Sequence, residues 1–238
     1  MIYKVGISGA SGRMGLEVAA LLAAGYSLKG NHLEFADAVV GNSKLVEIEG
    51  VETRKLEAPA REPVHVWIDF SRPSATLALI ETLDCPLVIG TTGFDDSQLE
   101  RLKAYSKKKA VLLAPNTSPG MALMRKMLRA LTGNLSDKFE IVLSEEHHRA
   151  KVDSPSGTAK QLLNLLSEQG LESGPVQVTR AGKLLGTHTV RLIASDEELS
   201  LTHRTYDRRV FARGALEAAL FLAAKGPGWY SMEDVFID

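Results

Sequence analysis

The start of the chain places a glycine loop directly between a β-rich run and a helical pattern. Residues 2–8 read IYKVGIS, residues 9–15 read GASGRMG, and residues 12–24 carry apolar side chains at helical spacing. Glycines at such a turn let the backbone approach a pyrophosphate closely, and the first amides of the helix then bind the anion. A packed strand–helix turn without a ligand also needs glycine, and the spacing G-x-x-G-x-x-G is not the commoner G-x-G-x-x-G. The position within a strand–helix unit favours dinucleotide binding, and the predicted contacts are Gly9, Ala10, Ser11, Gly12, Arg13 and Met14.

Strand-like and helical segments alternate along the first half of the chain. Apolar runs at 64–70, 86–89 and 110–114 are typical of strands, and helical patterns follow the first two. Such alternation predicts a parallel, doubly wound sheet of the Rossmann-like kind.

A further strand is expected at about 26–31, and it bears on the adenosine end of a dinucleotide. An acid about 20 residues after the glycine loop usually binds the ribose, and Glu34 stands near that offset. His32 competes for this role, and two solvated loop residues would fit the stretch equally well.

Two more loops follow predicted strands at the carboxyl edge of the expected sheet. Residues 90–93 read GTTG and residues 114–117 read APNT. Ligands of open parallel sheets bind beyond this edge, although ordinary turns have a similar composition. We predict that both loops contact the cofactor, through Gly90, Thr91, Thr92, Ala114, Pro115, Asn116 and Thr117.

The pattern changes after Asn116. A long helix is predicted over about 118–131, a strand over 139–145 and a second helix over 158–169. Segments near 187–194 and 198–206 flank a polar turn and predict an antiparallel pair, and a small-residue helix follows at 212–224. The expected fold class is therefore α/β, with a Rossmann-like parallel sheet domain over 1–116 and 212–238. An α+β domain with a mixed or antiparallel sheet is expected over 117–211.

Composition excludes several classes of protein. The net charge is −1, which does not suit a general polyanion binder, and charges break every apolar stretch well before the length of a membrane span. Cys85 is the one cysteine, so no internal disulfide forms, and its place before Pro86 favours a small buried residue over a nucleophile. These features, with no signal-peptide pattern at the start, predict a cytoplasmic protein.

Residues 145–159, EEHHRAKVDSPSGTA, gather many titratable groups directly before a predicted helix. His147 and His148 would point in different directions along an extended strand, so we expect no metal site. Ser156 or Thr158 can cap the helix, and its first amides then form an anion site beside Lys151 and Arg149. A solvated charged loop is the plainer alternative. The pattern favours a site that binds a carboxylate and supplies a proton.

The same stretch resembles the signature of the 4-hydroxy-tetrahydrodipicolinate reductase (dihydrodipicolinate reductase) family. The resemblance extends over nearly the whole chain and is most specific in the pattern HHR-x-K-x-D-x-PSGTA. Further matching segments are Gly9–Gly15, Asp69–Pro73, Gly90–Asp95, Ala114–Asn116 with Ser118, Arg180–Gly182, Gly186, His188–Thr189 and Thr202–His203.

This resemblance implies NADH- or NADPH-dependent reduction of a cyclic hydroxy-diacid in the diaminopimelate route to lysine. It implies that His147 donates or accepts a proton, that Lys151 is a second donor, and that the three loops of the first domain hold the cofactor. It also implies a homotetramer built by the sheet of the second domain, with no nucleic acid or membrane as partner. The substrate carboxylates would be held by His148, Gly157 and Thr158.

Two departures from the family pattern concern the cofactor. Thr117 stands where an aromatic residue is common, and no acid–arginine pair follows the expected second strand near Glu34. Another two-domain oxidoreductase acting on a cyclic diacid or imine remains an alternative, as does a dinucleotide sensor without catalysis. A sensor would not need His147 and Lys151, so their presence favours an enzyme.

Overall fold

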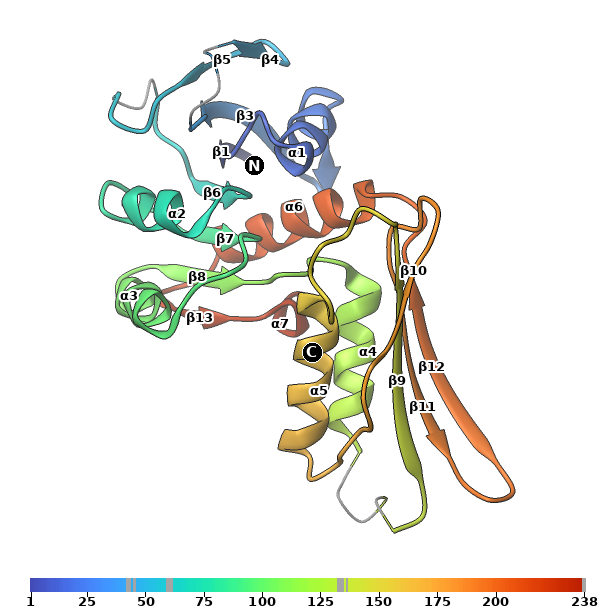
Figure 1. The fold of residues 1–238 in the computed structure, drawn as a ribbon. Helices are drawn as coiled ribbons and strands as arrows, with labels where there is room; N and C mark the ends of the chain where they lie inside the picture. The colour runs from blue at the N-terminus through green and yellow to red at the C-terminus, as the bar shows by residue number, and fades with distance from the viewer. Residues whose placement is uncertain (42–43, 45, 59–61, 132–134, 136, 237–238) are drawn as a thin grey trace. The chain divides into compact units, whose positions relative to one another are not determined.

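The computed structural model describes residues 1–41, 44, 46–58, 62–131, 135 and 137–236 (Figure 1). The chain divides into two compact units. One unit combines Met1–Ser118 with Arg209–Phe236, and the other is the continuous segment Pro119–Arg208. No helix among these described residues is long and apolar enough to cross a membrane.

The first unit is built on a mostly parallel sheet. Its central strands are short and apolar, and β6 (Val66–Asp69) and β7 (Leu87–Ile89) are buried at every position. Strands buried on both faces are typical of parallel sheets covered by helices, so the predicted Rossmann-like sheet is confirmed. The strand order is β13-β8-β7-β6-β1-β3-β5-β4, with β2 beside β3. The remaining bounds are β1 Ile2–Ser8, β2 Ser27–Leu28, β3 Asn31–Val39, β4 Glu47–Ile48, β5 Val51–Arg54, β8 Ala110–Leu113 and β13 Gly228–Tyr230.

Helices cover this sheet. Figure 1 shows α6 (Arg209–Ala223) beside the strands, and it packs against α1 (Arg13–Ala23). The α6 surface is made largely of buried alanines and one glycine, which lets the helix approach the strands closely. In contrast, α2 (Pro73–Ile80) and α3 (Asp96–Ser106) pack against each other, and the short α7 (Met232–Phe236) follows β13.

The strand expected at about 26–31 was misplaced. Ser27–Leu28 forms the two-residue strand β2 there and pairs antiparallel with β3, which begins at Asn31. The parallel neighbour of β1 is β3, which runs to Val39. The carboxylate of its buried Asp37 accepts hydrogen bonds from Nε and Nη2 of Arg54 on β5, at 2.9 and 2.7 Å. A charged pair inside the sheet removed the apolar pattern by which this strand would have been recognised.

The second unit packs two helices against a four-stranded sheet of order β10-β9-β11-β12. β9 pairs parallel with β10 and antiparallel with β11, and β11 pairs antiparallel with β12, so the predicted mixed sheet and antiparallel pair are confirmed. Leucines and methionines from α4 and α5 form one core with the inward side chains of β9 and β11. The bounds are β9 Glu140–His147, β10 Gln177–Arg180, β11 Thr187–Ile193, β12 Glu198–Arg204, α4 Pro119–Arg129 and α5 Gly157–Glu168.

Candidate active site

The glycine loop is held in a tight turn against two strand ends. Gly9 has φ +74°, and a Cβ there would lie 2.4 Å from the Phe70 carbonyl oxygen. The amides of Gly9 and Ala10 both donate to the Val39 carbonyl at the end of β3, at 3.0 and 3.2 Å. These two amides therefore shape the turn, whereas the first amides of α1 have no acceptor within the helix and are of the kind that binds an anion.

A pocket of about 600 Å³ opens at this turn. Its walls come from the glycine loop, the ends of β3 and β5, and the loop after β6. Glycine backbone at the wall and a helix start fit a dinucleotide phosphate. The lining includes Gly9, Ser11 and Gly12 from the predicted set, whereas Ala10, Arg13 and Met14 are not among it.

Glu34 does not lie at this pocket. It is an exposed residue in the middle of β3, opposite Lys4 of β1, because the strand ends at Val39 and not near Asn31. The ribose contact predicted at Glu34 assumed that the second strand ends near Asn31, whereas the strand beside β1 runs from Asn31 to Val39. Sequence reasoning also missed Lys55 and Arg72, which bring positive charge to the pocket from the ends of β5 and β6.

The loops after β7 and β8 are fixed by their own hydroxyl groups. The Thr91 hydroxyl donates to the buried Asp69 carboxylate at 2.8 Å and accepts from the Ser71 amide. Ser71 and Thr76 also donate to Asp69, whose pKa is raised by burial although these bonds oppose the rise. The Thr117 hydroxyl donates to the Phe211 carbonyl at 2.7 Å.

These bonds occupy the hydroxyl groups of Thr91 and Thr117 within the first unit, so at these two positions the backbone is what the loops offer to a ligand. Glycine at position 90 is required because a Cβ there would overlap the Phe70 ring. Thr92 is exposed, Ala114 is buried, and Pro115 and Asn116 are half-buried. The Asn116 side chain accepts from the Ser118 amide at 3.0 Å, which fixes the last turn before α4.

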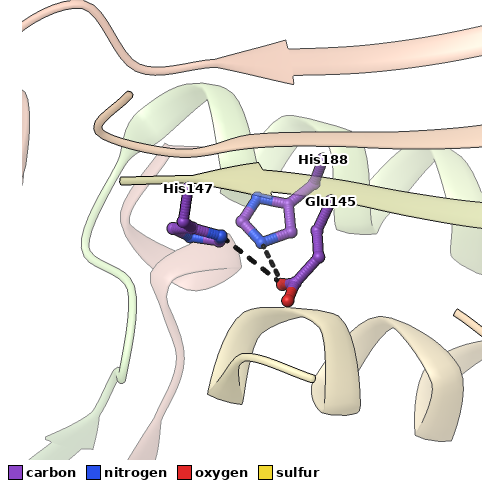
Figure 2. A group of neighbouring side chains, drawn as sticks. All are labelled: Glu145, His147 and His188. Carbon is purple, nitrogen blue, oxygen red and sulfur yellow. Dashed lines mark ion pairs between the residues drawn. The ribbon is translucent and has the colours of Figure 1, made fainter. Parts of the chain in front are cut away.

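In the second unit, a buried carboxylate lies between two histidines. Figure 2 shows His147 and His188 both directed toward Glu145. The Glu145 Oε2 atom is 3.6 Å from His147 Nδ1 and 3.6 Å from His188 Nε2, and the two imidazole centroids are 5.1 Å apart. All three residues are buried.

Strand alternation explains this grouping. On β9 every second residue faces α4 and α5, beginning with Ile141 and Leu143. Glu145 and His147 continue the same face, and His188 lies directly opposite Glu145 in the β9–β11 register. The apolar face of the sheet thus becomes polar at its last positions, beside the start of α5.

Further groups compensate the charge of Glu145. Arg180 Nη2 of β10 donates to it at 2.7 Å, and the Ser156 amide at the start of α5 donates at 3.1 Å. Burial alone would raise the pKa of Glu145, but His188, Ser156 and Arg180 together hold it well below its ordinary value. The carboxylate is therefore a fixed anion that joins β9, β10 and β11 to α5.

His147 is held in its neutral form. Burial lowers its pKa to about 4, and the neighbouring His188, Lys151 and Arg180 contribute in the same direction, whereas Glu145 opposes them. Its Nε2 atom lies against Gly186, where a Cβ would come within 3.1 Å. A neutral imidazole at this point can accept a proton from one partner and pass it to another.

The spacing of Glu145, His147 and His188 also satisfies the first requirement of a metal site, since their ligand atoms lie within 4.8 Å of one another. From the sequence only His147 and His148 were considered as a ligand pair, and this group was not predicted. The donor set fits an ion poorly, because Arg180 and the Ser156 amide already bond the carboxylate and the Ser156 hydroxyl lies 3.1 Å from His188 Nε2. A divalent ion would place two further positive charges beside the half-buried guanidinium of Arg180.

The start of α5 is arranged as an anion site. Ser156 is the N-cap, and its hydroxyl accepts from the Ala159 amide at 3.1 Å. Gly157 and Thr158 provide the first amides of the helix, and the Lys151 ammonium lies in the preceding loop. His147, Lys151, Gly157 and Thr158 thus belong to one end of the second unit. Among the described residues, no hydrogen bond or ion pair joins the side chain of the half-buried His148 to the group around Glu145.

No role was predicted from the sequence for Glu145, Arg180 or His188, although all three belong to the matched family pattern. Arg180 and His188 follow Glu145 by 35 and 43 residues along the chain and lie on other strands, so only the strand register brings the three residues together. A charged residue at an inward position of a predicted strand was the one available signal.

Comparison with known proteins gives a consistent result. Family models for the N-terminus and the C-terminus of dihydrodipicolinate reductase match residues 3–117 and 120–236. The 4-hydroxy-tetrahydrodipicolinate reductase of Haloarcula marismortui is 35% identical, over 98% of this chain and 98% of its own length. That of Aquifex aeolicus is 36% identical, over 99% of each chain. A solved dipicolinate-bound dihydrodipicolinate reductase from Paenisporosarcina sp. TG-14 has a TM-score of 0.73 at 20% identity, covering 98% of this chain and 99% of that one.

Proposed function

The chain belongs to the dihydrodipicolinate reductase family, and from this premise we propose that it reduces 4-hydroxy-tetrahydrodipicolinate to tetrahydrodipicolinate through the site at the start of α5. As a member of that family it is an NADH- or NADPH-dependent oxidoreductase of lysine biosynthesis, and its N-terminal unit is the dinucleotide-binding domain. The observation that carries the site assignment is the helix start with Lys151 and the buried His147 beside it.

The overall reaction adds a hydride and a proton to the substrate and removes one water. A bound dihydronicotinamide would supply the hydride. The hydroxyl group leaves as water together with a proton from a neighbouring ring carbon, and the electron-rich ring formed by hydride addition then takes up one proton, so both the departing hydroxyl and the reduced ring need a nearby proton donor and the neighbouring carbon needs an acceptor. Such chemistry requires the protein to bind two carboxylates and to move protons near neutral pH.

The residues of the second unit supply these functions. Lys151 and the amides of Gly157 and Thr158 bind a carboxylate, and His148 binds the other. His147 transfers a proton, because two substrate carboxylates would raise the pKa of a neighbouring imidazole that is neutral in the free protein. Lys151 is the second proton donor. The role of residues 117–211 as the substrate-binding and oligomerisation domain is part of this proposal.

Oxidation of NADH or NADPH with freshly generated substrate tests the function. We expect substrate-dependent oxidation of both nucleotides, with kcat/KM values that differ by less than about a hundredfold, or roughly 2.7 kcal/mol. The pocket is lined by the positive Lys55 and the negative Glu57, which fits modest discrimination between NADH and NADPH. A cyclic imine with a single carboxylate is the control. Faster turnover of that imine would favour the alternative oxidoreductase, and no oxidation with either substrate would favour a sensor.

We also propose a homotetramer in the cytoplasm, where amino-acid precursors and NAD(P)H meet. Within the described part of Pro119–Arg208, both α4 and α5 pack on one face of the sheet, and β12 is an edge strand with most residues exposed. Edge strands and open faces of this kind are usually covered by another chain. Sedimentation at micromolar concentration should give four times the 25.8 kDa chain mass, and a monomer mass would contradict the proposal.

A further inference from the structure

The loop between β9 and α5 carries its own carboxylate among the groups proposed to bind the substrate. The two oxygens of Asp153 accept from Lys151 Nζ at 2.8 and 3.0 Å. Partial burial would raise the pKa of Asp153, but the bonds from Lys151 and from the Gly157 amide outweigh it and lower the pKa. Asp153 is thus an ionised carboxylate held by one ammonium and one helix-start amide.

The backbone of this loop is anchored independently of that carboxylate. Arg180 Nη2, which also bonds Glu145, donates to the Asp153 carbonyl oxygen at 2.8 Å. The Lys151 amide donates to the His148 carbonyl at 3.1 Å. The Asp153 side chain can therefore leave Lys151 by rotating about its own bonds, while the loop and the start of α5 keep their places.

Lys151 and the Gly157 amide cannot serve two carboxylates at full strength. A second carboxylate at this point would repel the first, and it would share donors that one carboxylate already uses. The Asp153 side chain is 51% exposed and that of Lys151 is 22% exposed, so water screens their attraction and the pair is breakable.

We propose that Asp153 is a stand-in for a substrate carboxylate, which occupies Lys151 and the start of α5 in the free protein and is displaced when the substrate binds. This inference rests on the proposed function, since it assumes that a dicarboxylate uses these two groups. The stand-in favours ligands with two carboxylates, because a second contact elsewhere offsets the cost of displacing Asp153.

Calorimetric titration with dipicolinate in the presence of NADH tests the proposal on the full chain. Asp153→Asn keeps the side-chain shape and removes the charge. We expect its Kd for dipicolinate to fall about twofold to fivefold, the range that a screened ion pair corresponds to. Glu146→Gln is the matched control, because Glu146 is the next acid to the site on β9 but faces away from Glu145. It should change the Kd by less than Asp153→Asn does.

A double-variant cycle separates displacement from a general charge effect. In a Lys151→Ala background the gain from Asp153→Asn should shrink, because the ammonium for which the two carboxylates compete is gone. Weaker dipicolinate binding by Asp153→Asn would mean that Asp153 holds Lys151 ready for the substrate, and the proposal would be wrong. A gain equal to that of Glu146→Gln would overturn it as well. Tighter binding in a chain without reductase activity would support the stand-in and contradict the proposed function.

Discussion

Turnover is expected to fall by about a hundred to ten thousandfold when His147 is replaced by glutamine, the range for loss of a general acid or base. Glutamine fills the space beside Gly186 but cannot exchange a proton near neutral pH. His147 belongs to the second unit and is not part of the glycine loop, so the Kd for NADH should stay unchanged. Steady-state kinetics beside a direct NADH titration measures both quantities.

Lys151→Ala is expected to change the kinetics in a different way from His147→Gln. Lys151 contributes charge to carboxylate binding as well as a proton, so its loss should raise KM and lower kcat together. Since the pKa of His147 is about 4 in the free protein, kcat/KM should show no histidine-like titration between pH 5.5 and 7.5. Near-normal turnover of His147→Gln would make the histidine structural and leave proton transfer to Lys151 or water. Full activity of both variants would show that residues 145–159 are not the active site.

Glu145→Ala should lower the free energy of unfolding by about 3 kcal/mol, because removal of the buried carboxylate leaves the half-buried Arg180 guanidinium and the buried Ser156 amide without their acceptor. The guanidinium of Arg180 would lose its 2.7 Å partner, and the Ser156 amide would lose its acceptor. Urea unfolding followed by far-UV circular dichroism measures the change. A loss under about 1 kcal/mol would show that water replaces the carboxylate freely.

Arg180→Ala and the double variant provide the control for this second prediction. The double variant should be less destabilised than the sum of the two single changes, since both charges leave together.

Acid should also lower the free energy of unfolding of the wild-type protein. Glu145 has a lowered pKa, so its contribution is present above its ordinary value and is lost as the pH falls. His147, lowered from 6.5 to about 4, takes up its proton more readily in the unfolded chain across that interval, which again reduces stability toward low pH. Between pH 7 and pH 4 the free energy of unfolding should therefore fall less in the Glu145→Ala variant than in the wild-type protein.

The sequence predicted those parts of the protein that local patterns specify. The glycine loop, the strand–helix alternation and the antiparallel pair β11–β12 each follow from spacing along a short segment. β3 was misplaced because its buried Asp37 is neutralised by Arg54, a partner on another strand that periodicity cannot reveal.

The candidate site divides in the same way. The helix start at Ser156 was predicted from its cap and glycine, and it is confirmed. The position of Glu145 between His147 and His188 depends on the pairing of β9 with β11, and the register of two strands is set by the whole sheet. Likewise, Thr91 and Thr117 could not be recognised as loop anchors, because their partners lie 22 and 94 residues away.

The division of the first unit between two stretches of chain has a consequence for synthesis. Strand β13 and helix α6, which complete its sheet and cover it, are translated only after Arg208. Pro119–Arg208 is continuous and contains all of its own core, so it has every residue it needs while the last segment is still in the ribosome. Domains generally fold as units during translation. The inserted unit is therefore free to fold first, and the nucleotide-binding sheet, although begun earlier, is finished last.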